Sequence, residues 1–155
     1  MRRAQIAGLS LAVNDMLKLY VEVHNGIFAQ PWWRSVPIPG FFKAIDCRRY
    51  SVQIAEVEKN LRETTKHIAA LCAEVGSTDE NYVVTLQQYS EALCIAISAL
   101  AIIVNRLKAK AEGQTYSMRD YKQDVAAYQN AERQYHALGA EMNNQWHTFS
   151  QTNNE

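Results

Sequence analysis

All three prolines of this 155-residue chain lie between residues 31 and 39, and only six glycines are present. Proline removes a backbone donor and restricts the residue before it, so this segment cannot be helical. Residues 41–75, 77–112 and 114–138 contain neither proline nor glycine. So few turn-forming residues exclude a sandwich or barrel of many short strands and favour a few long helices.

These breaks divide the chain into four predicted helices, at about residues 3–29, 41–75, 78–112 and 117–149. Gly76 and Gly113 stand where helices commonly end with a glycine. Each is followed by a serine with an acidic residue three positions later, which is a signal for the start of a helix. The helices, a loop at 30–40 and a frayed tail at 150–155 form one predicted domain, residues 1–155.

Apolar residues recur at steps of three and four along every predicted helix. The third helix shows this pattern most clearly, at Tyr82, Leu86, Tyr89, Leu93, Ala96, Leu100, Ile103 and Leu107. A pattern sustained over this length indicates coiled-coil-like packing between helices. Long helices joined by short turns pack antiparallel, so we expect an all-α, up-down-up-down four-helix bundle with Leu93, Leu100 and Ile103 at its centre.

Charge and cysteine content narrow the class of protein. Sixteen basic and sixteen acidic residues cancel, which argues against a general nucleic-acid-binding protein. The three cysteines form no CxxC pair, so we expect reduced thiols and a cytoplasmic protein. The longest apolar run, residues 92–104, is shorter than the roughly 20 residues of a transmembrane helix, so a buried helix is predicted there instead.

Metal and cofactor sites are not predicted. His24, His67, His136 and His147 never form a Glu-x-x-His or His-x-x-x-His pair, and no phosphate-binding glycine loop is present. Arg62 and His67 fit the loose Arg-x4–6-His pattern of HEPN-type ribonucleases. Five helical positions separate them by about 140°, so catalysis would require a dimer that brings both into one cleft. We therefore favour a non-enzymatic protein.

A polar cluster is predicted at one end of the bundle. His24 and Asp124 fall in the apolar stripes of the first and fourth helices, with Tyr50 and Tyr121 at a similar depth. An imidazole near a carboxylate suits a small-ligand pocket or an acid/base pair, and equally a polar layer that fixes helix register. Glu132, further along the fourth helix, is expected to extend its carboxylate to solvent or to pair locally.

The loop after the first helix carries the strongest candidate contact residues. They are Trp32, Trp33, Arg34, Phe41 and Phe42. Residues 1–50 contain seven basic and three acidic residues, a net charge of +4, and the remainder carries −4. This loop can fold back as a plug, present aromatic and arginine anchors to a protein partner, or contact a membrane surface or single-stranded nucleic acid.

The sequence thus predicts a protein-interaction module of the regulatory, adaptor or immunity type, which binds another protein through this loop. The wide apolar arc of residues 78–112 suits either two neighbours within one bundle or a homodimer. The alternatives are a HEPN-like ribonuclease using Arg62 and His67, and a peripheral membrane or small-ligand-binding bundle.

Overall fold

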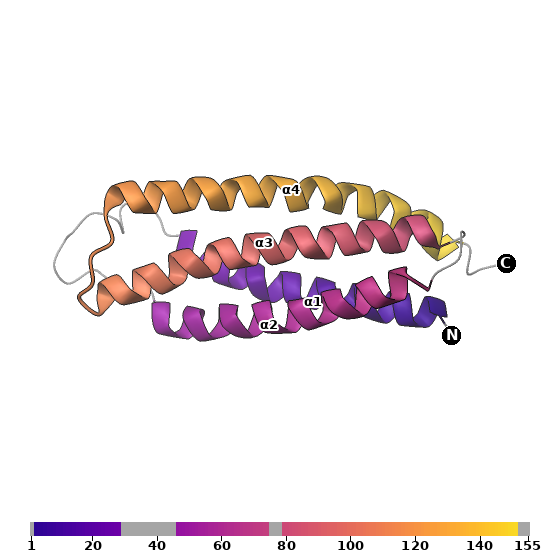
Figure 1. The fold of residues 1–155 in the computed structure, drawn as a ribbon, viewed down its shortest axis with the longest axis horizontal. Coiled ribbons are helices and arrows are strands. Elements are labelled where there is room, and N and C mark those ends of the chain that lie inside the picture. Colours follow the sequence, from indigo (N-terminus) through magenta and orange to yellow (C-terminus); the bar gives the residue numbers. More distant parts are fainter. Residues whose placement is uncertain (1, 29–45, 75–78, 152–155) are drawn as a thin grey trace.

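A computed structural model describes residues 2–28, 46–74 and 79–151. They form four helices, α1 (Arg2–Phe28), α2 (Cys47–Cys72), α3 (Glu80–Ala111) and α4 (Met118–Gln151), which lie along one long axis (Figure 1). The predicted all-α four-helix bundle is confirmed.

Consecutive helices run antiparallel, as predicted. Gln53 near the start of α2 donates a hydrogen bond to Glu22 near the end of α1, at 3.3 Å. The guanidinium of Arg3 at the start of α1 lies 5.4 Å from the ring centre of Phe149 at the end of α4. The first turn of α1 and the last turn of α4 therefore share one end of the bundle (Figure 1).

The start of α2 differs from the prediction. The helix begins at Cys47, because the carboxylate of Asp46 accepts a hydrogen bond from the backbone N–H of Arg49 at 3.0 Å. Aspartate at this position caps the free donors of the first helical turn. The prediction that Asp46 is helical was therefore wrong. Residues 41–45, which were also predicted to be helical, lie outside the described part of the chain.

The serine predicted to begin α3, Ser77, lies outside the described ranges. Asp79 occupies the N-cap position without capping the helix, because its carboxylate binds Arg3 at 2.8 Å. By contrast α4 begins as predicted: Ser117 Oγ accepts from the Asp120 N–H at 3.0 Å and donates to its carboxylate at 2.7 Å. Gly113, with φ +96°, ends α3 as expected.

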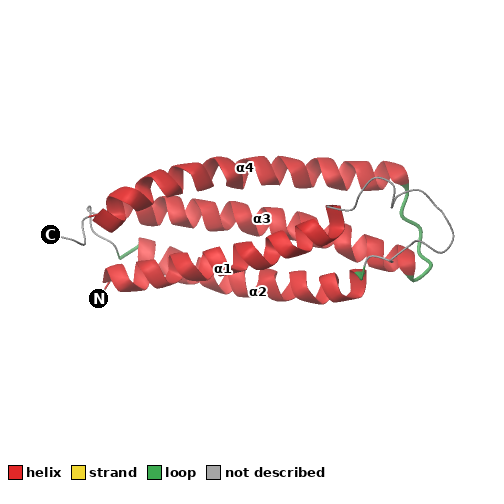
Figure 2. Cartoon of the chain, turned by 180° about the vertical axis from the view of Figure 1, so that it is seen from behind, coloured by secondary structure: helices red, strands yellow, loops and turns green. Residues whose placement is uncertain are grey.

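Helix α3 is central to the bundle. Its Cα atoms come within 8 Å of those of all three other helices, whereas α4, over the residues that the structure describes, has such neighbours in α3 alone. Seen from behind, α1 and α2 lie on one side of α3 and α4 on the other (Figure 2). Leu93, Leu100 and Ile103 are completely buried, so the predicted centre of the core is confirmed.

Helix α3 is also apolar on most of its surface. Among the described helices, it alone is long and apolar enough to cross a membrane, judged by length and composition only. Half of its most apolar stretch is buried inside the bundle. Its remaining apolar surface includes Ile95 and Ile102, which are 56% and 49% exposed.

Candidate functional site

Helices α1 and α4 face each other without close backbone contact. No Cα atom of α1 lies within 8 Å of one of α4 in the described ranges. Side chains fill the space between them, which we call the α1–α4 seam. Most are aromatic: Tyr20, His24 and Phe28 from α1, Tyr82 and Tyr89 from α3, and Tyr128, Tyr135, Trp146 and Phe149 from α4. The two helices are thus joined by long side chains.

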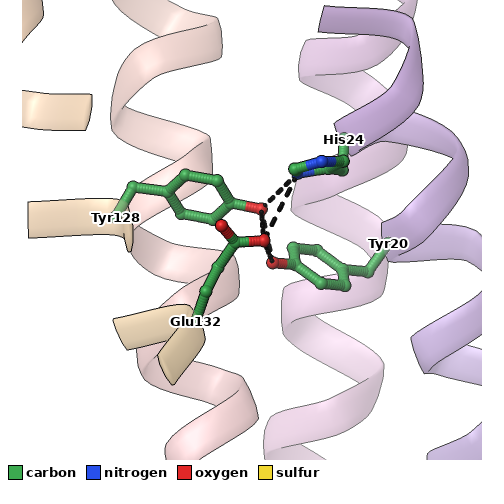
Figure 3. A network of polar contacts seen from close by, with 4 residues as sticks. All are labelled: Tyr20, His24, Tyr128 and Glu132. Atoms are coloured by element: carbon green, nitrogen blue, oxygen red, sulfur yellow. Dashed lines mark hydrogen bonds and ion pairs between the residues drawn. The ribbon is translucent and has the colours of Figure 1, made fainter. Parts of the chain in front are cut away.

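Three of these seam residues, Tyr20, His24 and Tyr128, form a hydrogen-bonded network with Glu132 of α4 (Figure 3). The hydroxyl of Tyr128 lies 2.5 Å from the hydroxyl of Tyr20 and 2.7 Å from Nδ1 of His24. It also donates to Oε1 of Glu132 at 3.0 Å. His24 Nδ1 and Glu132 Oε1 are 3.5 Å apart. Tyr128 is therefore the centre of the network, which joins two residues of α1 to two of α4.

Helical spacing explains why these four side chains meet. Tyr20 and His24 are four residues apart on α1, as are Tyr128 and Glu132 on α4, so each pair occupies one face across one turn. The two tyrosines sit in the apolar stripes of their helices and are each 1% exposed. His24 and Glu132 lie nearer solvent, with side chains 30% and 21% exposed.

Burial controls the protonation of the two phenols. It is the main reason that the pKa of Tyr20 and that of Tyr128 are raised well above the usual value, and the charge of Glu132 raises the pKa of Tyr128 further. Both phenols are therefore donors at neutral pH. If Tyr20 and a His24 Nδ1–H donate to the Tyr128 oxygen, and Tyr128 donates to Glu132, each hydrogen bond of Tyr128 has one donor and one acceptor.

The network can pass a proton between His24 and Glu132 through the hydroxyl of Tyr128. It contains no serine, cysteine or lysine that could act as a nucleophile. The ring of Phe28 stacks on that of Tyr128 at 5.6 Å and 10°, which covers one side of the network. Groups that satisfy one another in this way hold two helices in one register.

The predicted polar cluster is only partly assembled. The carboxylate beside His24 is that of Glu132, whereas Asp124 lies two turns away along α4. Asp124 instead accepts hydrogen bonds from Tyr116 at 2.6 Å and from Arg106 at 2.8 Å. The expected pairing of His24 with Asp124 was therefore wrong, because Arg106 of α3 takes the aspartate.

Tyr50 and Tyr121 lie outside the network. Tyr50 packs against the backbone of α1 at Gly26, so closely that a Cβ atom at position 26 would collide with its ring. The guanidinium of Arg49 lies over this ring, 5.9 Å from its centre. Tyr121 packs edge-on against Tyr116, with ring centres 5.9 Å apart. Both tyrosines therefore pack locally.

Sequence reasoning did not pair the hydroxyls of Tyr20 and Tyr128. Glu132 was expected to extend to solvent or to pair locally; it pairs with Tyr128, and it also reaches His24 on the opposite helix. The signal that could have found the network is the repeated four-residue spacing of a tyrosine and a titratable residue within an apolar stripe, on both helices.

Two other groups of candidate residues were predicted from the sequence, the ribonuclease pair and the aromatic and arginine residues after the first helix. Arg62 binds the carboxylate of Glu58 at 2.8 Å and donates to Ser98 at 3.1 Å, while His67 is exposed. Within one chain, these two candidates of the ribonuclease hypothesis do not form a shared site. The predicted contact residues Trp32, Trp33, Arg34, Phe41 and Phe42 lie outside the described ranges.

Metal binding finds no support in the described ranges, where no group of three or more histidine, cysteine, aspartate or glutamate side chains could hold an ion.

Comparison of the chain with protein-family models, with curated proteins and with solved structures finds no match.

Proposed function

We propose that the protein is a non-enzymatic helical-bundle interaction module that self-associates through the outer face of α3. We define this face by Glu91, Ile95, Ile102 and Arg106, whose side chains are all exposed. At 100° per residue they fall within an arc of about 60°. The observation that supports the proposal is the exposure of two isoleucines, 56% and 49%, on the central helix of the bundle.

The order of charges along α3 favours a second copy of the chain as the partner. The acidic residues Glu80 and Glu91 lie in the first half of α3, and the basic residues Arg106, Lys108 and Lys110 lie near its end. Parallel copies in register would bring like charges together. Antiparallel copies bring opposite charges together, which favours association and fixes orientation.

Antiparallel pairing also aligns the apolar residues. A two-fold axis midway between Ser98 and Ala99 places Ile95 of one copy opposite Ile102 of the other. The same axis places Glu91 opposite Arg106, because both pairs are centred on the same point in the sequence. Arg106 also binds Asp124 of its own chain at 2.8 Å, and its side chain remains 50% exposed. A two-fold interface is self-complementary in this way, with the same patch used by both copies.

A dimer presents two copies of the loop that contains Trp32, Trp33, Arg34, Phe41 and Phe42. We infer from their composition that these residues bind another protein, since tryptophan and arginine are the commonest interface anchors. The three cysteines, Cys47, Cys72 and Cys94, are free thiols, which suits a cytoplasmic location.

The mass of the protein in solution tests the dimer. In sedimentation equilibrium, we expect the wild type to approach twice 17.6 kDa with rising concentration, and Ile102→Glu to remain at 17.6 kDa. Val52→Glu is the matched control, because Val52 is a 66% exposed aliphatic residue that lies on α2 and not on α3. A wild type that stays monomeric at all concentrations contradicts the proposal. Vesicle binding by that monomer, lost in Ile102→Glu, would support the membrane alternative.

A charge exchange tests the antiparallel arrangement. Glu91→Lys and Arg106→Glu should each weaken their own homodimers, because every cross-pair becomes a like-charge pair. An equal mixture of the two variants should form a heterodimer. In it, the introduced lysine of one copy faces the introduced glutamate of the other, and the second cross-pair is the native one. Failure of the mixture to associate would reject this arrangement even if Ile102→Glu is monomeric.

A further inference from the structure

A second binding feature lies in the α1–α4 seam, away from the outer face of α3. It is a pocket of about 180 Å³ lined by all three helices that meet there. Val13 and Met142 form apolar walls from α1 and α4, and Tyr89 reaches it from α3. The pocket is bounded by the sequence-distant helices of the seam, so only the folded bundle creates it.

Gly139 keeps the pocket open. It lies within α4, where glycine is the least favourable residue after proline, and it lines the pocket without filling it. A Cβ atom at position 139 would lie 3.1 Å from Cε2 of Tyr89, which is closer than an ordinary contact. The ring of Tyr89 therefore occupies the place that a side chain at 139 would need.

Tyr89 brings an unused hydrogen-bonding group to this pocket. The residue is 4% exposed, yet its hydroxyl makes no hydrogen bond with the parts of the chain that the structure describes. Burial, followed by the neighbouring Tyr135, raises the pKa of Tyr89 to about 12, so the phenol keeps its proton at neutral pH. The hydroxyl is not among the fully enclosed polar atoms that lack a partner, so it is accessible and can donate to a ligand in the pocket.

The other polar groups at the pocket are neutral. They are the hydroxyl of Ser10 and the amides of Asn14 and Asn143, and no charged side chain contributes to the lining. A charged ligand would lose its hydration there without an opposite charge to replace it. In volume the pocket compares with an engineered protein cavity of about 150 Å³ that binds benzene. These properties select a small, neutral, largely apolar molecule.

We propose that this pocket binds a neutral, single-ring aromatic molecule whose hydrogen-bond acceptor takes the O–H of Tyr89. The apolar walls hold the ring, and the phenol orients it. The site does not depend on the self-association proposed above.

The test compares phenol with toluene, which has the same size but no hydrogen-bonding group. Binding is followed through the ¹³C-labelled methionine methyl groups, of which Met142 lines the pocket and Met118, 67% exposed outside it, is the internal control. We expect both ligands to shift the Met142 signal saturably and to leave Met118 unchanged. Absence of saturable binding by phenol, or equal shifts at both methionines, overturns the proposal.

Two pairs of variants locate the ligand. Tyr89→Phe should weaken phenol about three- to tenfold, the usual worth of one neutral hydrogen bond, and leave toluene unchanged. Tyr121→Phe, a tyrosine outside the pocket, should change neither. Equal affinity of phenol for wild type and Tyr89→Phe overturns the assigned hydrogen bond.

Gly139→Ala should weaken the binding of both ligands, whereas Gly8→Ala, where a Cβ meets nothing within 4 Å, should weaken the binding of neither. This second pair decides the location even if Tyr89→Phe fails to fold.

Discussion

The hydroxyl of Tyr20 lies 2.5 Å from that of Tyr128, although the helices that carry them have no Cα atoms within 8 Å of each other where the chain is described. The two rings meet edge to face at 6.5 Å and span this distance together. Hydrogen bonds are directional, whereas apolar contacts between helices tolerate sliding. The register of α4 relative to α1 therefore depends on the network centred on Tyr128.

Removal of the two hydroxyls should have unequal effects. Tyr128→Phe deprives Tyr20, His24 and Glu132 of a common partner, and we expect it to lower the free energy of unfolding by about 1–3 kcal/mol. Tyr20→Phe should have a smaller effect, because Tyr128 keeps His24 and Glu132. Urea unfolding of both variants and of the double variant measures the coupling. A larger loss for Tyr20→Phe would contradict the central place of Tyr128.

Alkaline pH should unfold the bundle through its tyrosines. Burial raises the pKa of Tyr20, Tyr128 and Tyr89 in the folded state, to about 12 for Tyr89, above the value of about 10 in an unfolded chain. Their contribution to stability is complete below about pH 10 and is lost as the pH rises from there, because the unfolded state then releases protons more readily. Phenolate absorbance and helical circular dichroism should change together. Phenolate formation by these buried tyrosines with the helices intact would contradict this coupling.

The architecture was predictable because its signals are local and repeated. The absence of proline and glycine sets three of the helices, and the steps of three and four place Leu93 and Leu100 in the core. Capping was predictable where it depends on neighbours in sequence, as at Ser117. At the start of α3 the neighbouring sequence is not enough, because Arg3, far away in the sequence, binds the carboxylate of the N-cap residue Asp79.

The site was less predictable for the same reason. A stripe shows that His24 faces inward, but it does not fix the height of α1 relative to α4. Two turns along α4 separate Asp124 from Glu132, and only the folded structure shows that Arg106 binds the former. The pocket beside Gly139 depends on three helices at once, so no local pattern in the sequence indicates it.

Acid should weaken the contact between α2 and α3 through Glu58. Burial raises the pKa of Glu58, but hydrogen bonds from Ser98 at 2.5 Å and Arg62 at 2.8 Å outweigh it and lower the pKa. Its contribution to stability is therefore present above the unfolded value of about 4.3 and lost as the pH falls below it. Glu58→Gln should be less stable than the wild type at pH 7, with the difference shrinking toward pH 3. Glu56→Gln, at an exposed position of α2, is the control. A difference that stays constant over this range would rule out a protonation effect.

Truncation of α3 should separate its buried seam from its outer face. Leu93, Leu100 and Ile103 are completely buried, and replacing any of them by alanine removes apolar contacts and leaves a cavity. We expect each replacement to lower the free energy of unfolding by about 2–5 kcal/mol. Ile102→Ala, at a position that is 49% exposed in the monomer, should lower it by less than about 1 kcal/mol when measured at concentrations below dimerisation. Urea unfolding at low and high protein concentration distinguishes the two classes. Losses below about 1 kcal/mol at all three buried positions would mean that this seam of α3 is not the centre of the core.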